Sequence, residues 1–190
     1  LKAAKNAVAP EIDNIYSEDS AVLSKCDKLI LPGVGNFKSA ANKLTGLGLR
    51  SFILDRTQKA GTHILGICLG MQLLFEFSEE GGGAKGLGLI EGKVGKFPES
   101  TPKIPHIGFN EARPSEHSKL FADLQHLDFY FVHSYRVVDV PEKVDSFSIC
   151  SYGGDFIASI EYQNFFGTQF HPEKSQKNGL KLLKNFLSLK

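Results

Sequence analysis

Short apolar runs alternate with runs of helical character over the first 77 residues. The runs at 28–31 and 63–67 are almost uninterrupted apolar segments, which is typical of strands buried on both faces of a sheet. Helices are expected at residues 1–9, 19–25, 36–44, 48–60 and 69–77, and a further short strand at residues 11–16. Strands that alternate with helices in this way predict βαβ units and a parallel sheet with helices on both faces.

The pattern changes after Ser78. A glycine-rich loop at residues 79–86 is followed by strand-like segments that are separated by short turns. These segments are residues 87–97, 104–112, 129–138, 147–152, 156–162 and 165–170. The chain closes on an expected helix at residues 178–189, whose apolar face carries Leu180, Leu183, Phe186 and Leu187. We therefore expect an α/β fold in which an antiparallel extension is attached to a mostly parallel central sheet.

The length of 190 residues is the usual size of one globular domain, so we expect a single domain over residues 1–190. The chain opens at Leu1, without methionine, on a segment of helical character. Helices of this kind usually follow a strand in α/β folds. We therefore expect that a first strand belongs before residue 1 and is missing from this sequence.

Charge and apolar run length disfavour two classes of partner. The formal net charge is +1 and the basic residues are spread along the chain, so no basic patch points to nucleic acid or an anionic membrane. The apolar runs are far shorter than the roughly 20 residues that cross a bilayer, and no signal segment opens the chain. We expect a cytoplasmic protein whose partners are small molecules or another protein.

The three cysteines have to be explained one at a time. Cys26, Cys68 and Cys150 are odd in number and lie at no metal-ligand spacing, which disfavours a disulfide framework and a zinc site. We expect no metal and no cofactor. Cys26 and Cys150 have no neighbouring base in the sequence and are interpreted as core residues.

Cys68 lies where the apolar strand at 63–67 meets the following helix, with Gly66 and Gly70 two residues to either side. A strand, a sharp turn with a reactive residue and a helix are the parts of a nucleophile elbow. The helix N-terminus favours the thiolate form of a cysteine, and the backbone amide of Leu69 can donate to an oxyanion. The alternative is a buried cysteine that fills space between sheet and helix.

A nucleophilic cysteine needs a base, and His171 is the histidine best placed to serve. It ends an apolar strand, Pro172 restricts the backbone after it, and Glu173 follows as a carboxylate that can orient the imidazole. Cys68 and His171 both end apolar runs, and strand ends at one edge of a sheet are neighbours in space. The alternative is an ordinary surface turn.

A second strand end carries glycines in Leu31-Pro-Gly-Val-Gly-Asn. Backbone amides in such a loop can face an anion or an oxyanion, although the same residues are compatible with a simple turn.

Together these motifs resemble the class I (triad) glutamine amidotransferases, and most closely the glutaminase subunits of imidazole glycerol phosphate synthase. The resemblance rests on Pro32-Gly-Val-Gly, Gly66-Ile-Cys-Leu-Gly-Met-Gln, Gly86-Leu-Gly-Leu-Ile, Pro105-His-Ile-Gly-Phe-Asn, Phe131-Val-His-Ser-Tyr and Phe166-Gly-Thr-Gln-Phe-His-Pro-Glu-Lys-Ser. These motifs cover nearly the whole chain in the family's order. The resemblance implies a three-layer, flavodoxin-like α/β fold.

The resemblance also implies roles for individual residues. Cys68 attacks the side-chain amide of glutamine, His171 transfers the proton and Glu173 orients His171. The oxyanion donors are the backbone amides of Leu69 and of the loop that contains Val34 and Gly35. Substrate glutamine is held by Gln72, Glu80, Tyr130, Ser134 and Tyr135, with Glu80 expected at the α-ammonium group. His133 receives no catalytic role but is expected to line the site.

Family members of this kind pass ammonia to a partner synthase. The implied partner is the cyclase subunit, a (β/α)₈ barrel that forms a heterodimer with the glutaminase in L-histidine synthesis. His106, Phe109 and Lys174 match the family's partner-facing positions.

Two departures from the family pattern stand out: the missing first strand, and Phe109 where histidine-pathway subunits commonly carry tryptophan. Paralogues that supply ammonia to a surface-sugar amidotransferase share the fold and the triad, so this pathway is an alternative. Two further alternatives are another α/β hydrolase with a Cys-His pair, and a protein that binds glutamine without turning it over.

Overall fold

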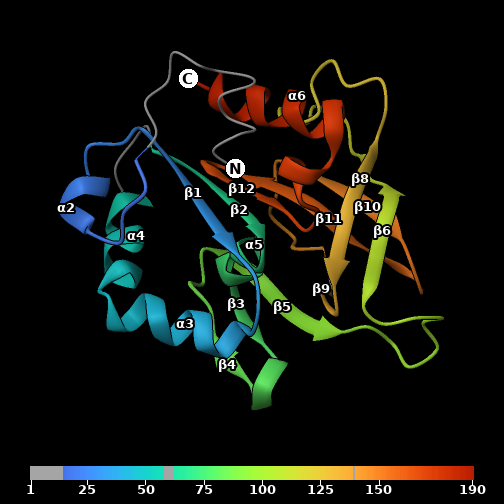
Figure 1. The fold of residues 1–190 in the computed structure, drawn as a ribbon, viewed down its shortest axis with the longest axis horizontal. Coiled ribbons are helices and arrows are strands. Elements are labelled where there is room, and N and C mark those ends of the chain that lie inside the picture. Colours follow the sequence, from blue (N-terminus) through green and yellow to red (C-terminus); the bar gives the residue numbers. More distant parts are fainter. Residues whose placement is uncertain (1–14, 58–61, 139) are drawn as a thin grey trace.

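The computed structural model describes residues 15–57, 62–138 and 140–190, which form an α/β structure with mixed sheets (Figure 1). The helices are α2 Ser20–Leu23, α3 Phe37–Gly46, α4 Leu49–Thr57, α5 Leu69–Leu74 and α6 Gln176–Leu187, with 3₁₀ turns η1 Glu80–Gly82 and η2 Pro172–Lys174. The strands are β1 Lys28–Gly33, β2 His63–Cys68, β3 Phe75–Ser78, β4 Ala84–Lys85, β5 Ile90–Lys96, β6 His106–Glu111, β7 Arg113–Pro114, β8 Asp128–His133, β9 Tyr135–Val137, β10 Ser146–Ser151, β11 Asp155–Tyr162 and β12 Phe165–Thr168.

The main sheet runs in the order β1-β2-β12-β11-β10-β7. The strands β1, β2 and β12 are parallel, and β2 lies between the other two. The strands β11, β10 and β7 extend this sheet through antiparallel pairs. Two smaller sheets, β4-β3-β5-β9 and the hairpin β6-β8, complete the fold. The β2–β12 pairing is what brings the segments after Ile67 and after Thr168 to the same edge, because these two residues are in register.

The main sheet separates two apolar cores. Alternate side chains of a strand point to opposite faces, so Ile64 packs with α3, α4 and α5, whereas Leu65 and Ile67 pack with α6. The helix α6 buries Leu183 and Phe186, as its sequence predicts, and also Leu182, whereas the expected Leu180 and Leu187 are only partly buried. Figure 1 shows α6 lying apart from α3 and α4, with the strands between them. Two covered faces of one sheet give the three layers expected of the fold class.

Most elements expected from the apolar pattern are present within a few residues of their expected bounds. Among these, α3 begins where Asn36 caps it, since the Asn36 side chain accepts a hydrogen bond from the Ser39 amide at 3.0 Å. The antiparallel extension is confirmed, and it is larger than expected because it makes up three of the strands in the main sheet.

Three expectations were wrong or only partly met. The helix expected at 69–77 ends at Leu74, because Phe75 turns to an extended backbone and pairs in β3 with Ile90 of β5. The strand expected at 129–138 is broken at Ser134 into β8 and β9, which belong to different sheets. Ile15 and Tyr16 are not in a strand. The helix expected at 1–9, the rest of the strand at 11–16 and the end of the helix at 48–60 lie outside the described residues.

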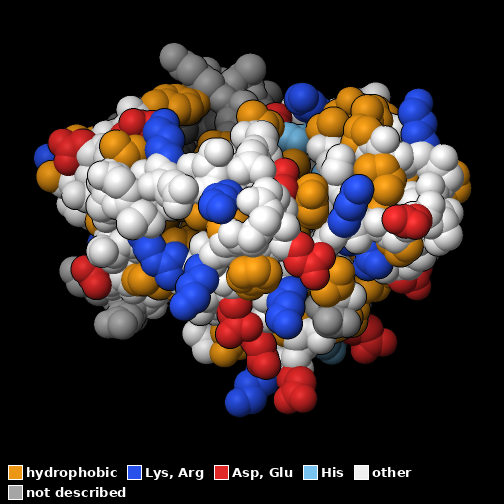
Figure 2. Space-filling view, turned by 90° about the horizontal axis from the view of Figure 1, so that it is seen from below, with side chains coloured by type: hydrophobic (Ala, Val, Ile, Leu, Met, Phe, Trp, Pro, Cys, Tyr) orange, Lys and Arg blue, Asp and Glu red, His pale blue; other side chains and the backbone are white. Residues whose placement is uncertain are grey.

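In the described ranges, no helix combines the length and the apolar character that crossing a membrane requires. Figure 2 shows acidic and basic side chains interspersed over one face of the molecule, in keeping with the net charge of +1.

Candidate active site

Cys68 ends β2 and immediately precedes α5, and its backbone is strained. Its φ of 55° and ψ of −111° lie outside the regions that non-glycine residues normally occupy. Such strain costs on the order of 1–3 kcal/mol and is usual at nucleophile elbows, where it projects the side chain out of the turn. The side chain is only 6% exposed. The strand-to-helix corner predicted at Cys68 is therefore present.

The glycines beside Cys68 serve close packing. A Cβ on Gly66 would lie 2.6 Å from the backbone of Gly70, and a Cβ on Gly70 would lie 1.7 Å from the carbonyl oxygen of Leu31. Neither glycine has a positive φ, whereas Cys68 does. The residue with the unusual backbone at this corner is therefore Cys68, and Gly66 and Gly70 let β1, β2 and α5 approach one another.

His171, which is buried, and Glu173, which is partly buried, form a hydrogen-bonded pair. His171 follows β12, and its Nδ1 lies 2.8 Å from Oε1 of Glu173. Burial acts to lower the pKa of His171, but interactions with Cys68 and Glu173 outweigh it and raise this pKa to about 9. Burial likewise acts to raise the pKa of Glu173, but the hydrogen bond and charge of His171 lower it. The pair therefore favours an imidazolium beside a carboxylate.

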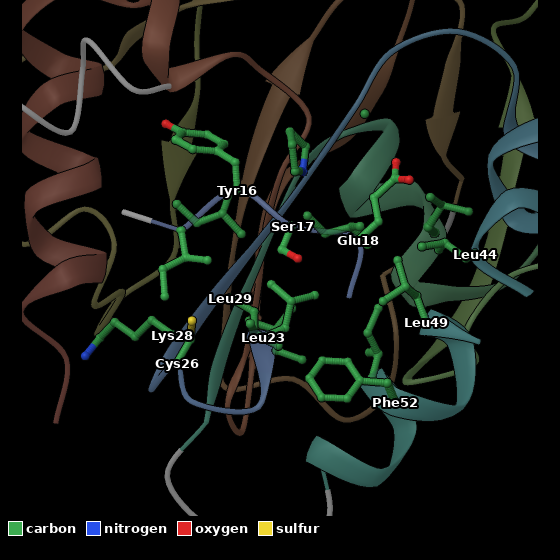
Figure 3. A pocket seen from close by; sticks show the side chains of 18 of the residues that line it. Tyr16, Ser17, Glu18, Leu23, Cys26, Lys28, Leu29, Leu44, Leu49 and Phe52 are labelled. Atoms are coloured by element: carbon green, nitrogen blue, oxygen red, sulfur yellow. The ribbon is translucent and has the colours of Figure 1, made fainter. Parts of the chain in front are cut away.

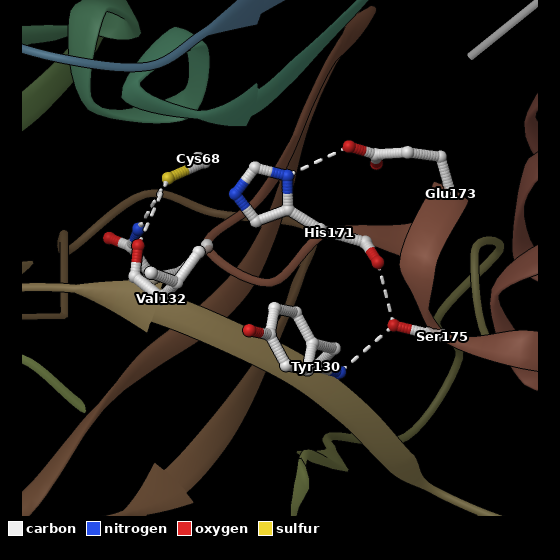
Figure 4. Close-up of polar contacts among 7 residues, drawn as sticks. Cys68, Tyr130, Val132, His171, Glu173 and Ser175 are labelled. Carbon is white, nitrogen blue, oxygen red and sulfur yellow. Dashed lines mark hydrogen bonds and ion pairs between the residues drawn. The ribbon is translucent and has the colours of Figure 1, made fainter. Parts of the chain in front are cut away.

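The other ring nitrogen of His171 points toward the nucleophile. Figure 4 shows the ring between Glu173 on one side and the Cys68 thiol on the other. Within the described part of the chain, Nε2 of His171 is buried and has no hydrogen-bond partner of normal geometry. The ring of His171 therefore faces Cys68 without a hydrogen bond of normal geometry, and the interaction with Cys68 is one of the causes that raise the pKa of His171. A proton on Nε2 is positioned for transfer to a group that reacts with the sulfur.

The His171–Glu173 pair makes stability depend on pH. The pKa of His171 is raised from 6.5 to about 9 on folding, so its contribution is complete below pH 6.5 and is lost as the pH rises through 9. The pKa of Glu173 is lowered from 4.5, so its contribution is present above pH 4.5 and is lost at lower pH. We expect Glu173→Gln to lower the free energy of unfolding by roughly 2 kcal/mol between pH 4.5 and pH 6.5. The difference from the unmodified chain should shrink as the pH rises toward 9. Urea denaturation at several pH values measures this difference, and a gap that widens with rising pH contradicts the assignment.

Ser175 fixes the backbone around His171, a role not anticipated from the sequence. Its hydroxyl donates to the carbonyl of His171 at 2.7 Å and accepts from the amide of Tyr130 at 2.9 Å (Figure 4). The amide of His171 in turn donates to the Tyr130 carbonyl at 2.8 Å. The turn that carries the triad base is thereby attached to β8. The available signal was a serine just before the final helix, in the position of a helix cap.

Gln72 lies one turn into α5 and is 4% exposed. Its Nε2 donates to the Tyr135 carbonyl at 3.0 Å and to Oε1 of Gln169 at 2.9 Å. Gln169 is fully buried, and its own Nε2 lies 3.7 Å from the sulfur of Cys68. Gln169 received no role from the sequence, although a polar residue within an apolar strand and two positions before His171 was a usable signal.

The residues expected to form the oxyanion loop are next to Cys68. Gly33 is in register with Cys68 across the parallel β1–β2 pair, and Val34 and Gly35 follow it. Gly35 has a φ of 100°, a conformation that favours glycine. Val34 is 78% exposed, and Leu69 is the first residue of α5. The loop and the start of α5 therefore flank the nucleophile.

Glu80 begins η1, and its carboxylate has a partner within the chain. Its Oε2 accepts a hydrogen bond of 2.7 Å from the amide of Phe37 at the start of α3. This contact connects the loop after β3 to the segment that directly follows Val34 and Gly35. This contact was not predicted, because it joins residues that are 43 positions apart.

The remaining residues expected around the substrate belong to β8, β9 and the break between them. Tyr130 and Tyr135 are partly buried and lie on β8 and β9, and Ser134 separates these strands. The Tyr135 carbonyl oxygen also accepts a hydrogen bond of 2.8 Å from Nδ1 of His133. Tyr135 therefore contacts Gln72 with its backbone carbonyl and not with its ring.

The residues expected at a partner interface divide into two groups. Phe109 is 50% exposed and Lys174 is exposed, and both lie against the Tyr130 ring. The side chain of His106, by contrast, is 2% exposed, stacks on Tyr152 and lies 3.1 Å from Nε2 of His133. Burial lowers the pKa of His106 to about 4. The expectation that the His106 side chain faces a partner is therefore corrected: β6 alternates sides, and His106 points inward while Ile107 and Phe109 point outward.

Other parts of the described chain offer no competing site. The described residues contain no cluster of three or more groups suited to hold a metal ion. A large apolar groove of about 1310 Å³ lies along β1, between α2, α3 and α4, and includes Leu29, Leu44 and Phe52 (Figure 3). Neither Cys68 nor His171 lines this groove. Within the described residues, Cys68 and the His171–Glu173 pair lie at the ends of the neighbouring strands β2 and β12.

Comparisons with known proteins agree with this geometry. Residues 2–189 match the family model described as glutamine amidotransferase class-I. The chain is 48% identical over 186 residues to the imidazole glycerol phosphate synthase subunit HisH of Aquifex aeolicus, with 97% of this chain and 87% of that protein covered. It is 44% identical over 192 residues to the subunit of the same name from Methanocaldococcus jannaschii, with 100% and 94% covered. Among solved structures, a crystal structure of a glutamine amidotransferase is similar in fold, with a TM-score of 0.76 at 17% identity over 98% of this chain and 89% of that chain.

Proposed function

This chain belongs to the class-I glutamine amidotransferase family, and from that premise we propose that it is the glutaminase subunit of an imidazole glycerol phosphate synthase in L-histidine synthesis. The reaction is hydrolysis of glutamine to glutamate and ammonia. The proposed site of action is the cytoplasm. The observation that carries the proposal is the line of three side chains at one sheet edge: a strained Cys68, the ring of His171 and the carboxylate of Glu173, 2.8 Å from that ring.

In the proposed first half-reaction, the Cys68 thiolate attacks the side-chain amide carbon of glutamine. The carbonyl electrons move to oxygen, and we assign the backbone amides of Leu69, Val34 and Gly35 as donors to this oxyanion. The imidazolium of His171 gives its Nε2 proton to the amide nitrogen, the C–N bond breaks and ammonia leaves. The products of this step are a glutamyl thioester on Cys68 and a neutral His171.

In the second half-reaction, neutral His171 accepts a proton from water while the water oxygen attacks the thioester carbon. The C–S bond then breaks, the new carboxyl group loses its proton to solvent as glutamate is released, and the thiolate–imidazolium pair is restored. Glu173 holds Nδ1–H of the ring throughout and stabilises the imidazolium in both half-reactions.

We further propose how substrate glutamine is held. Gln72 uses its amide N–H groups within the chain, which leaves its Oε1 to accept from the substrate. Glu80 is assigned to the α-ammonium group, and Tyr130, Ser134 and Tyr135 to the wall of the pocket. Because Glu80 also binds the Phe37 amide, an ammonium at this carboxylate lies close to the start of α3.

The proposed partner is a cyclase subunit with a (β/α)₈ barrel, bound as a heterodimer. An apolar surface near the triad supports this assignment: Val34, Ile107 and Phe109 are 78%, 54% and 50% exposed, respectively. Isolated exposed apolar residues are common, but three at the loop and hairpin that flank the catalytic edge suit a protein contact. Lys174, beside Tyr130, adds a positive charge to this surface.

Glutamate release measured with and without a cyclase subunit and its nucleotide ligand tests the partner assignment. We expect the rate to rise at least about tenfold when the cyclase is present, which corresponds to about 1.4 kcal/mol of activation free energy. Stimulation by a surface-sugar amidotransferase, with no effect of the cyclase, assigns the chain to the alternative pathway instead.

A further inference from the structure

Gln169 is a buried side chain that hydrogen-bonds both to the nucleophile and to a proposed substrate-binding residue. It follows β12, and its backbone amide donates to the Ala158 carbonyl of β11 at 2.8 Å. Its side-chain Oε1 accepts from Nε2 of Gln72 at 2.9 Å, and its Nε2 donates to the sulfur of Cys68 at 3.7 Å. A nitrogen-to-sulfur distance of this size suits a hydrogen bond, because sulfur is larger than oxygen.

The direction of these hydrogen bonds is fixed by a backbone group. The Tyr135 carbonyl can only accept, so the atom of Gln72 that lies 3.0 Å from it must be the NH₂ group. The same NH₂ group faces Gln169, so the facing atom of Gln169 must be its carbonyl oxygen. The NH₂ group of Gln169 is then left to face Cys68. No flip of either carboxamide preserves all three contacts.

This polarity distinguishes the two protonation states of Cys68. A thiol can donate to the Val132 carbonyl, which lies 3.9 Å from the sulfur (Figure 4). A thiolate cannot donate and is repelled by that carbonyl, but it accepts a charge-assisted hydrogen bond from Gln169. Hydrogen bonds in a chain polarise one another, so the bond from Gln72 to Gln169 strengthens the donor that faces the sulfur.

We propose that Gln169 is a functional residue of the glutaminase reaction, one that stabilises the Cys68 thiolate through its side-chain N–H and connects it to the substrate-binding residue Gln72. Gln169 stabilises the thiolate at two stages: in the resting enzyme, and again when the sulfur leaves the glutamyl thioester. In the thioester itself the sulfur is neutral, and the hydrogen bond is weak. The role of the thiolate as a nucleophile rests on the proposed function, but its stabilisation by Gln169 can be measured without turnover.

The test is the rate of Cys68 alkylation by iodoacetamide as a function of pH, with the modified peptide identified by mass spectrometry. Gln169→Met keeps the length of the side chain and removes the donor, and we expect the pH midpoint of alkylation to rise by about 1 unit. Thr168→Val is the matched control, because the Thr168 hydroxyl is equally buried but has no partner in the described structure. It should leave the midpoint unchanged. A folded Gln169→Met protein with the midpoint of the unmodified chain overturns the proposal.

A second measurement needs no variant at position 169. The side-chain ¹⁵N–H resonances of Gln169 in the unmodified chain should shift with pH at the same midpoint as alkylation, and this titration should vanish in Cys68→Ala. A Gln169 resonance that ignores the state of Cys68 overturns the proposal. In glutamine turnover with a cyclase, Gln169→Met should lower kcat about tenfold and change KM less than about threefold. Alkylation and NMR do not depend on turnover. If the chain does not hydrolyse glutamine but shows the shifted alkylation midpoint and the Gln169 titration, the proposed function is refuted and the role of Gln169 stands.

Discussion

Cys68→Ala should lower glutamine turnover by about 10⁴-fold or more while leaving the fold and glutamine binding intact. The expectation follows from the position of the thiol: it is the only side chain at the β2–α5 corner that can form a covalent intermediate, and the imidazolium of His171 faces it. Loss of one sulfur atom from a side chain that is already strained and buried leaves the surrounding packing in place. Glutamate release in the presence of a cyclase, together with glutamine binding by calorimetry, separates loss of chemistry from loss of the site.

The other two cysteines provide the matched controls. Burial raises the pKa of Cys150 to about 12, so this thiol stays protonated and unreactive at neutral pH. Cys26 is partly buried and precedes β1, at the opposite end of that strand from Gly33, which pairs with Cys68. Cys150→Ala and Cys26→Ala should each change turnover less than about threefold. Unchanged glutamate release from Cys68→Ala refutes the assigned nucleophile.

Gly70→Ala should destabilise the protein by at least about 4 kcal/mol, a large part of the stability of a domain this size. The added Cβ would lie 1.7 Å from the carbonyl oxygen of Leu31, and this oxygen belongs to β1 and not to a flexible side chain. To remove this overlap, α5 has to move away from the parallel strands. That movement disrupts both the packing of α5 and the corner that carries Cys68. Urea denaturation of the purified variant measures the loss.

Gly46→Ala is the control for the effect of replacing a glycine as such. Gly46 ends α3, and an added Cβ there meets no atom within 4 Å. It should change the free energy of unfolding by less than about 1 kcal/mol, in the stabilising direction. A Gly70→Ala protein that unfolds at the same urea concentration as the unmodified chain contradicts the close approach of α5 to β1.

The parts of the site that the sequence predicts are those that depend on one strand end each. Cys68, His171 and Glu173 end or follow apolar runs, and the pairing of β2 with β12 brings them to one edge, as parallel strands in α/β folds are expected to do. The His171–Glu173 contact could be predicted as well, because the two residues are only two positions apart in the chain. Fold class follows from the same alternation of strands and helices.

The parts that the sequence does not predict depend on contacts between distant segments. The helix expected at 69–77 stops at Leu74 because Phe75 pairs with Ile90 of β5. The strand β3 that begins there has only four residues, too few for a recognisable periodicity in the sequence. His106 reads as a surface residue of a hairpin, but its side chain is buried because it meets His133 and Tyr152. Gln169 stands out in the sequence as a polar residue in an apolar run, but only the positions of Gln72 and Tyr135 reveal the direction of its carboxamide.

The most direct test of the central claim follows the amide nitrogen itself. Glutamine labelled with ¹⁵N at the side-chain amide is supplied to the complex of this chain with a cyclase and its nucleotide substrate, and the label is traced by mass spectrometry. We predict that the label enters the product of the cyclase in step with glutamate release, that Cys68→Ala abolishes both, and that unlabelled ammonia in the buffer dilutes the label very little. Glutamate release that is equal with and without the cyclase, with the label found only as free ammonia, contradicts the account.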